Sequence, residues 1–237
     1  MDVNKNSYTL GFAAIMVIIV AALLSVAFIK LKPFQDRNIE LEKKQNILSS
    51  VGVKVERDAA EKAYDTYITS DLVLNNKGDT LEDAGSAFDI DLSKEIKKEA
   101  SAQLLPLFIS EVDGRTMYII PLRGKGLWGP IWGFISLEDS LNKVYGAVFD
   151  HKGETPGLGA EINKVDFQEQ FAGKTIFEGE EFISIAVIKG RDTKGDKHAV
   201  DGISGGTITS DGVSEMLSER LNMYLPYFKK KQLKKIN

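Results

Sequence analysis

The hydrophobic and polar positions along the chain divide it into one long apolar run and a larger part with short periodic patterns. No residue from Asn6 to Ile29 is charged, and Leu10–Ile29 is apolar on every side of a helix. About 20 helical residues span about 30 Å, which is the thickness of the hydrocarbon core of a bilayer. The pattern predicts a transmembrane helix at residues 10–31, after a short N-terminal tail at residues 1–9.

A cleaved signal peptide is the alternative interpretation of this run, with Ser25-Val26-Ala27 as its cleavage site. Signal peptides have apolar regions of about 7–15 residues after a basic start, whereas this run is longer and follows only Lys5. The lengths favour a retained anchor. The positive-inside rule compares Lys5 with the basic residues that follow the span, and it places the large domain in the cytoplasm. Those basic residues are Lys30, Lys32 and Arg37.

The membrane-proximal part of the soluble domain, residues 32–106, has a mixed and mainly helical pattern. Apolar residues recur at helical spacing, and Gly52 and Pro106 are positioned to end helices. We expect helices at Asn38–Val51, Ala59–Ser70 and Leu92–Leu105, and a short strand with a following turn at Leu72–Gly78.

Residues 107–228 begin with strand patterns. PLFIS, TMYIIPL, PIWGFISLE and KVYGAVFD are short runs rich in Ile, Val, Phe and Tyr, separated by Gly, Asp and Asn. Because they lie close together in sequence, we expect an antiparallel meander. Further expected elements are a helix at Val165–Phe171, a strand at Glu181–Lys189 and a C-terminal helix with one apolar face. The predicted class is α+β: a single N-terminal transmembrane helix, then a soluble domain whose twisted antiparallel sheet is packed by helices.

Charge and composition exclude several classes of function. The net charge is −4, which gives no reason to expect nucleic acid as a partner. Without cysteine the chain has no disulfide or thiolate-bound metal, and with two histidines and no suggestive carboxylate spacing we expect no metal site. The basic C-terminal tail at 229–237 is interpreted either as a frayed, solubilising end or as a contact for anionic lipid or an acidic partner. Its lysines are Lys229, Lys230, Lys231, Lys234 and Lys235.

The segment Ser204–Thr209 (SGGTIT) directly precedes the apolar pattern of the last helix. Two glycines allow a sharp bend with accessible N–H groups, and a helix N-terminus favours negative charge, so the segment could hold a phosphate. The alternative is a hydroxyl-rich turn in which Thr209 or Ser210 caps the helix. It is neither a P-loop nor a dinucleotide-binding fingerprint.

Two further glycine-rich segments are candidate ligand contacts. GETPGLGAEI begins at Gly153, and GKGLWGPIWGF begins at Gly124 and contains Trp128 and Trp132. Each could be only a connector or a site of core packing, and Trp128 could instead form an aromatic wall against a flat ligand. No hydrolase motif is present, so we expect no catalytic residue, and the two histidines are interpreted as hydrogen-bonded turn residues.

The three segments in this order, behind an anchor, resemble the NqrC family, the C subunits of the bacterial Na⁺-translocating NADH:quinone reductases, which have an FMN-binding domain. The resemblance covers nearly the whole chain and is most specific at HAVDGISGGTITS, His198–Ser210. This stretch is similar to the flavinylation signal Asp-x-x-Ser/Thr-Gly-Ala-Thr, with Gly206 in place of the alanine. The matching residues are Asp201, Ser204, Gly205 and Thr207.

The resemblance implies covalent FMN, joined through its phosphate to Thr207, with Thr209 as the alternative acceptor, by a separate flavin transferase. It also implies that the flavin ring lies against the other two segments, where Trp128, Thr155, Leu158 and Gly159 are the expected contacts. The implied function is one-electron relay inside a Na⁺-pumping complex that contains other subunits. The chain would have no complete activity alone.

The family's soluble domain faces the outer side of the bacterial inner membrane, which conflicts with the charge count. We give the resemblance precedence because three basic residues against one is a weak bias and partner subunits can fix orientation. We therefore expect a single-pass protein that contacts membrane lipid, with a periplasmic domain. Two other interpretations stay open: the equivalent flavin-carrying G subunit of the Rnf ferredoxin:NAD⁺ oxidoreductase, and a membrane-anchored binding or scaffold protein without a cofactor.

Overall fold

The computed structural model describes residues 5–190 and 192–236, with side chains described as far as residue 233. The chain divides into two compact units, Met1–Lys43 and Lys44–Asn237. Only the second unit contains the glycine-rich segments.

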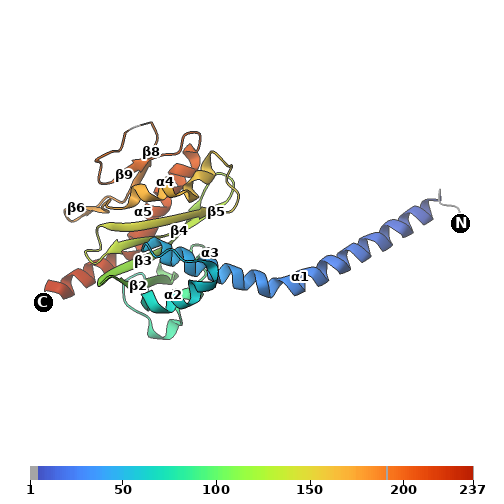
Figure 1. The fold of residues 1–237 in the computed structure, drawn as a ribbon, viewed down its shortest axis with the longest axis horizontal. Helices are drawn as coiled ribbons and strands as arrows, with labels where there is room; N and C mark the ends of the chain where they lie inside the picture. Colours follow the sequence, from blue (N-terminus) through green and yellow to red (C-terminus); the bar gives the residue numbers. More distant parts are fainter. Residues whose placement is uncertain (1–4, 191, 237) are drawn as a thin grey trace. The chain divides into compact units, whose positions relative to one another are not determined.

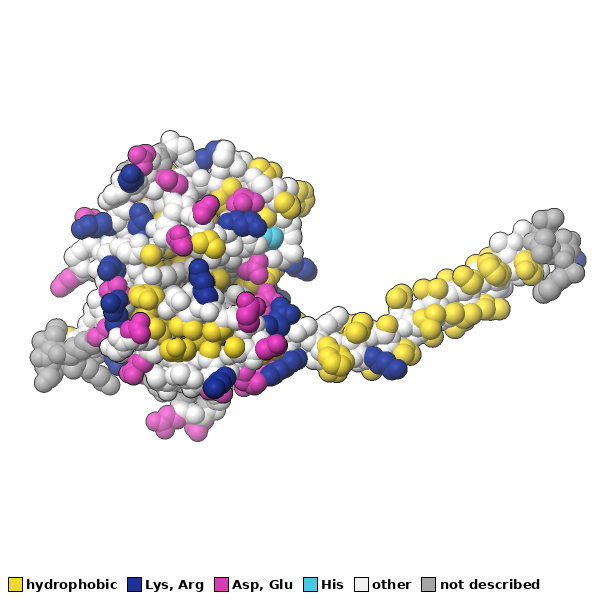
Figure 2. Space-filling model, viewed as in Figure 1, with side chains coloured by type: hydrophobic (Ala, Val, Ile, Leu, Met, Phe, Trp, Pro, Cys, Tyr) yellow, Lys and Arg dark blue, Asp and Glu magenta, His cyan; other side chains and the backbone are white. Residues whose placement is uncertain are grey.

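The first unit consists of most of α1 (Asn6–Ser50), a single helix of 45 residues. The sequence predicts a span and a separate helix at Asn38–Val51, but the helix is continuous through both. Its apolar residues between Leu10 and Phe34 are exposed, as the side chains along this helix in Figure 2 show. Within the described residues this is the one helix long and apolar enough to cross a membrane. An exposed apolar surface of this size is typical of a segment that is covered by a membrane or a partner.

The second unit is built on a five-stranded antiparallel meander with the strand order β1-β2-β3-β4-β5 (Figure 1). This confirms the predicted sheet. The long β3–β4 pair runs in unbroken register from Met117↔Glu138 to Lys125↔Pro130. The chain therefore enters a tight turn directly after Lys125. The strands are β1 (Ile68–Leu74), β2 (Leu105–Val112), β3 (Arg115–Lys125), β4 (Pro130–Glu138) and β5 (Val144–His151).

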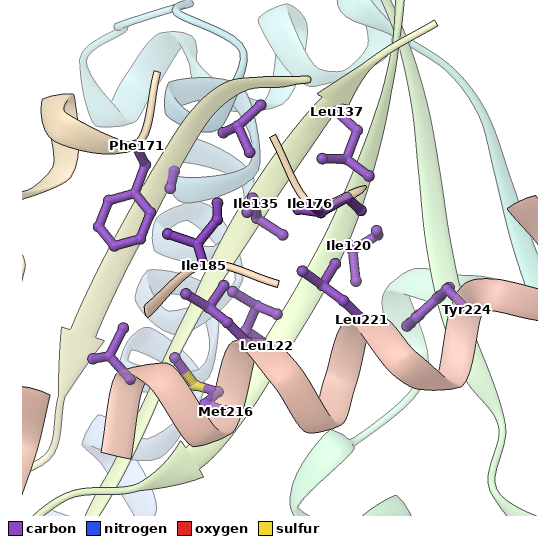
Figure 3. Close-up of a cluster of buried hydrophobic side chains, with 14 of the residues drawn as sticks. Ile120, Leu122, Ile135, Leu137, Phe171, Ile176, Ile185, Met216, Leu221 and Tyr224 are labelled. Atoms are coloured by element: carbon purple, nitrogen blue, oxygen red, sulfur yellow. The ribbon is translucent and has the colours of Figure 1, made fainter. Parts of the chain in front are cut away.

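The C-terminal helix α5 (Thr207–Ile236) packs along one face of this sheet (Figure 3). Alternate β3 residues face it, because successive side chains of a strand point to opposite faces. Tyr224 is fully buried, and its hydroxyl donates to Pro106 O at 2.7 Å. The predicted apolar face is thereby confirmed. Its main contacts are Ile120, Leu122, Ile135 and Leu137 on the sheet, and Met216, Leu221 and Tyr224 on the helix.

The opposite sheet face is covered by the last turns of α1 and by the segments that follow. Ile47 and Val51 are fully buried there against Phe108, Met117 and Ile119. Both faces of the central strands are therefore apolar, which explains why β3 and β4 read as nearly continuous hydrophobic runs. The short helical elements between α1 and β2 are η1 (Arg57–Ala59), α2 (Ala60–Tyr67), η2 (Glu82–Ala84), η3 (Ala87–Asp89), α3 (Leu92–Glu95) and η4 (Ala100–Ala102).

Beyond β5 the chain forms η5 (Gly159–Asn163), α4 (Val165–Gln168) and η6 (Glu169–Phe171), which confirms the expected short helix at Val165–Phe171. Two small ribbons then lead to α5. One is the antiparallel pair β6 (Phe177–Glu178) and β7 (Glu181–Phe182). The other is the parallel pair β8 (Ala186–Ile188) and β9 (Ala199–Asp201).

Two predicted helices are wrong in extent. Leu92–Leu105 contains only the short helix α3 and the 3₁₀ helix η4. The buried Glu95 carboxylate accepts from Leu104 N at 2.9 Å, a contact that a continuous helix over this range could not make. Pro106 lies inside β2 and does not stop a helix there. The helix expected at Ala59–Ser70 ends at Tyr67, since Ile68 already pairs with Ser110 of β2.

The strand expected at Glu181–Lys189 is interrupted. Ser184 has a φ of 68°, a left-handed conformation that breaks an extended chain. The N–H groups of Ile183 and Ser184 both donate to Ile176 O, at 2.9 and 3.0 Å. The interruption ends β7 and redirects the chain into β8.

The C-terminal basic tail differs from a frayed end as far as it is described. Helix α5 continues to Ile236, Lys230 pairs with Asp79, and the ammonium of Lys231 lies 5.7 Å from the centre of the Tyr118 ring. The side chains of Lys234 and Lys235, and all of Asn237, lie outside the described residues.

Candidate functional site

The three glycine-rich segments lie at turns next to one another. The first is the β3–β4 turn, closed by Gly126 N donating to Gly129 O at 2.8 Å. The second follows β5, and the third joins β9 to the start of α5. The meander and the return of α5 thus bring segments that are far apart in sequence to one place.

Glu154 joins all three segments. Its carboxylate is buried, with 5% of the residue exposed. Oε1 accepts from Trp128 N of the β3–β4 turn at 2.8 Å, and Oε2 accepts from the Thr209 hydroxyl of α5 at 2.6 Å. Bonds to a charged acceptor are stronger than neutral ones, so this side chain fixes the mutual position of the three turns.

Glycine is required where these turns touch. A Cβ on Gly159 would lie 2.3 Å from Thr209 Oγ1 and 2.5 Å from Glu154 Oε2, closer than real atoms pack. Gly205 has a φ of 76°, and a Cβ there would meet Leu158 Cδ2 at 2.5 Å. The glycines thus serve close approach as well as bending.

The two candidate acceptor threonines have opposite environments. Thr207 is the first residue of α5 and is exposed. Thr209 is 1% exposed, and its hydroxyl donates to Glu154. The prediction that Thr209 or Ser210 caps the helix is wrong, because both residues lie inside its first turn. Ser210 Oγ instead accepts from Ile203 N at 3.2 Å.

Asp201, the last residue of β9, and Ser204 precede the candidate acceptor Thr207, and both are exposed. Asp201 Oδ1 accepts from the hydroxyl of Thr193 at 2.7 Å and from Thr193 N at 3.0 Å. These hydrogen bonds hold the pKa of the Asp201 carboxyl below its usual range. Its backbone N–H donates to Gln170 Oε1 at 2.8 Å, so the end of β9 is held from two sides.

Apolar side chains remain exposed around these turns. Trp128 is 69% exposed, which contradicts the core-packing interpretation of this residue. Leu158 and Ile208 are 41% and 56% exposed, although each neighbours a buried residue. Thr155 is exposed, and its carbonyl accepts from Leu158 N and Ala160 N at 3.1 Å. An indole, two aliphatic tips and a hydroxyl are thus exposed on the turns that surround Thr207.

The roles of two residues of this site could not be predicted from the sequence. In the sequence, Glu154 is noticeable only as a polar group of its glycine-rich segment. A single carboxylate between glycines is nevertheless a signal for a buried side chain that links neighbouring turns. Lys189 follows β8, and its ammonium lies 3.0 Å from Thr207 Oγ1. No motif surrounds this lysine, so only the parallel pairing of β8 with β9 reveals it.

The histidines are hydrogen-bonded, as expected. His151 Nδ1 accepts from Glu154 N at 3.1 Å, and His198 Nδ1 lies 2.7 Å from Thr175 O. His151 ends β5 and His198 directly precedes β9, so both lie at strand ends. Within residues 5–190 and 192–236 no group of three metal-ligating side chains occurs.

A cleft of about 790 Å³ lies elsewhere on the second unit, between residues Asn46–Lys54, β5 and the segment Asn163–Ala172. None of the residues Asp201–Thr209 lines it. This cleft is therefore separate from the three turns.

Replacing Gly159 with alanine should destabilise the second unit by about 1–3 kcal/mol, the usual effect of overpacking a tight site. The added methyl would separate Thr209 from Glu154. Gly153→Ala is the matched control, because a Cβ there has nothing within 4 Å and no positive φ is involved. Urea unfolding of flavin-free protein, followed by the fluorescence of its two tryptophans, measures both. Equal stability of the two variants would contradict the described contact.

Comparison with known proteins matches this chain to a domain family and to several relatives. The model of the FMN-binding domain family matches residues 126–222, a range that contains all three turns. The C subunit of the Na⁺-translocating NADH-quinone reductase of Haemophilus ducreyi is 32% identical, covering 89% of this chain and 88% of that protein. The corresponding Pseudomonas aeruginosa protein is also 32% identical, with 90% of each chain covered.

Solved structures give the same result. The crystal structure of the C subunit of this reductase from Parabacteroides distasonis has a TM-score of 0.77 and 45% identity, covering 84% of this chain and 96% of that one. The Shewanella oneidensis NqrC structure has a TM-score of 0.71 at 24% identity, covering 82% of this chain and 98% of that one, and is therefore informative about the fold alone.

Proposed function

Because this chain belongs to the NqrC family, the C subunits of the Na⁺-translocating NADH-quinone reductases, we propose that it relays single electrons through an FMN bound covalently to Thr207. The bond is a phosphoester between the flavin's phosphate and the threonine hydroxyl. The relay operates inside a Na⁺-pumping membrane complex with other subunits. A separate flavin transferase attaches the cofactor, which is why the chain needs no catalytic base of its own.

The observation that carries this proposal is the exposed hydroxyl of Thr207 at the first position of α5. A helix start leaves backbone N–H groups without intrahelical partners and favours negative charge, so a phosphate is well placed there. Gly205 and Gly206 keep the approach free of side chains. Thr209 fits the acceptor role poorly, because its hydroxyl is buried against Glu154.

Trp128 and Leu158 provide the apolar surface that a flat flavin ring needs. Thr155 adds a hydroxyl at the edge of this surface, and Gly159 allows the turn that carries both to touch α5. When bound, the flavin supplies one-electron redox chemistry. The residues of this chain fix its position and shield one side of it from water.

The proposed location is the bacterial inner membrane, with α1 as a single-pass anchor in contact with lipid and the second unit on the periplasmic side. Protease added to intact spheroplasts should then digest the second unit, since it faces the medium. A cytoplasmic protein of the same cells should stay intact as the control. Protection of the second unit would overturn this placement.

Transient kinetics of the purified complex test the relay. NADH added anaerobically should reduce the flavin on this chain, and oxidised quinone should then reoxidise it. A complex assembled with flavin-free chain should lose quinone reduction while its other subunits still oxidise NADH with an artificial acceptor. Full quinone reduction without flavin on this chain would refute the proposed function.

A further inference from the structure

Lys189 places an ammonium directly against the proposed acceptor. Its Nζ donates to Thr207 Oγ1 at 3.0 Å, although the two residues are 18 positions apart. Both side chains are exposed, so neither is forced into this contact by burial. A hydrogen bond between two exposed groups contributes little stability, so this contact alone does not account for the position of the Lys189 side chain.

Two contacts hold the backbone before Lys189, one to α5 and one to the segment that leads into it. Val187 N donates to Ser214 Oγ of α5 at 2.8 Å. Gly202 N donates to Ile188 O at 2.8 Å, extending the parallel pairing of β8 with β9 beyond Ile188↔Asp201. Lys189 directly follows Ile188, so these two contacts fix the backbone position from which its side chain extends.

Among the described residues, the contacts of Lys189 include no carboxylate. Asp201 Oδ1 accepts from Thr193, and the two oxygens of Glu154 accept from Trp128 N and Thr209. Asp192 Oδ1 accepts from Lys194 N at 2.9 Å in the β8–β9 loop, and Asp211 is a further acidic residue, four positions after Thr207 on α5. The ammonium of Lys189 contacts the Thr207 hydroxyl at the start of a helix, and neither this hydroxyl nor the helix N-terminus carries a compensating negative charge.

We propose that Lys189 is a positioning residue that pairs with the phosphate of the FMN on Thr207. This inference rests on the proposed function, because the anion it explains is the phosphoester itself. A phosphodiester carries one negative charge near neutral pH, which one ammonium neutralises. The pairing holds the flavin's tether against the start of α5 instead of leaving it free to swing. An ammonium beside an anion forms a charge-assisted hydrogen bond, stronger than the bond to the neutral hydroxyl that it replaces.

Phosphorus NMR of the flavin-carrying full-length protein tests the pairing. At neutral pH the ³¹P resonance of the phosphoester should move in Lys189→Gln, because the charged partner of the phosphate is removed. Lys189→Arg should keep a resonance close to the wild-type position, because a guanidinium also pairs with a phosphate. A merely structural role would not produce this set of shifts.

Lys194→Gln is the matched control, since this exposed lysine belongs to the same loop and should leave the resonance unchanged. A Lys189→Gln protein with the wild-type resonance, or a Lys189→Arg protein with the resonance of Lys189→Gln, would overturn the inference while leaving the proposed function intact. Wild-type protein that carries no phosphoester at all would instead overturn the proposed function. The mass of each sample, measured before and after the NMR experiment, verifies that the adduct survives.

Discussion

Replacing Thr207 with alanine should remove the covalent flavin completely. Protein made in cells with the flavin transferase and run on a denaturing gel should show flavin fluorescence in the wild type and none in Thr207→Ala. The hydroxyl oxygen forms the bond to phosphorus, so no other change in the site has an effect of this size. Folding should be nearly unaffected, because Thr207 is exposed at the helix start.

Two further variants make this prediction specific. Thr207→Ser keeps the hydroxyl and should keep the fluorescence. Thr209→Ala removes a buried hydrogen bond to Glu154, so it should lower stability by about 1–2 kcal/mol yet retain the covalent flavin. Fluorescence in Thr207→Ala, or its disappearance only in Thr209→Ala, would show that the acceptor is misassigned.

Replacing Glu154 with alanine should have the largest effect on the stability of the site. It leaves the part-buried Trp128 N–H and the buried Thr209 hydroxyl without their acceptor. Each unsatisfied group costs about 1–3 kcal/mol, so the expected loss is about 2–4 kcal/mol in the free energy of unfolding. The three turns should separate, and the fraction of protein that carries flavin should fall with the loss of the site's geometry.

Glu154→Gln separates hydrogen bonding from charge. An amide can accept from Trp128 N and donate to the Thr209 oxygen, so most of the stability should return. Glu161→Ala is the matched control: that carboxylate accepts from Gly157 N at 2.9 Å within a single exposed turn and should cost less than about 1 kcal/mol. Urea unfolding and flavin absorbance measure both quantities. Glu154→Ala that is as stable as Glu161→Ala would contradict the bridging role.

The parts of the fold governed by local pattern could be predicted from the sequence. The meander follows from four β-rich runs with turn residues between them, and α5 follows from its apolar face. The failures occur where distant contacts decide. Glu95 accepts from Leu104 N, a contact that a continuous helix could not make, and Ile176 O bends a strand by accepting from Ile183 and Ser184. Neither partner can be recognised from periodicity.

The site shows the same division. Asp201 to Thr207 could be found because the motif is contiguous in sequence, and Trp128 and Leu158 lie in glycine-rich segments that stand out. Their exposure agrees with the proposed flavin contact. Lys189 could not be found, because its role depends on a two-strand parallel pairing and on the return of α5. The motif already favours Thr207 over Thr209 as the acceptor, and the burial of the Thr209 hydroxyl agrees with this prediction.

The identity of the complex is supported by full-length similarity and not by any single motif. The Haemophilus and Pseudomonas relatives match about nine-tenths of the chain and are C subunits of the quinone reductase. This favours that complex over the related ferredoxin:NAD⁺ oxidoreductase, whose flavin-carrying protein shares the same signal. It also leaves a cofactor-free scaffold without a specific observation in its favour.

Mass spectrometry of the tryptic peptide His198–Arg220 tests the central claim most directly, because no lysine or arginine lies between its ends. In protein from cells with the flavin transferase, the mass of this peptide should be increased by the mass of FMN less one water. Fragmentation between Thr207 and Ile208 should place the whole increment on the N-terminal side. An unmodified peptide, or an increment on the side that contains Thr209, would contradict the account.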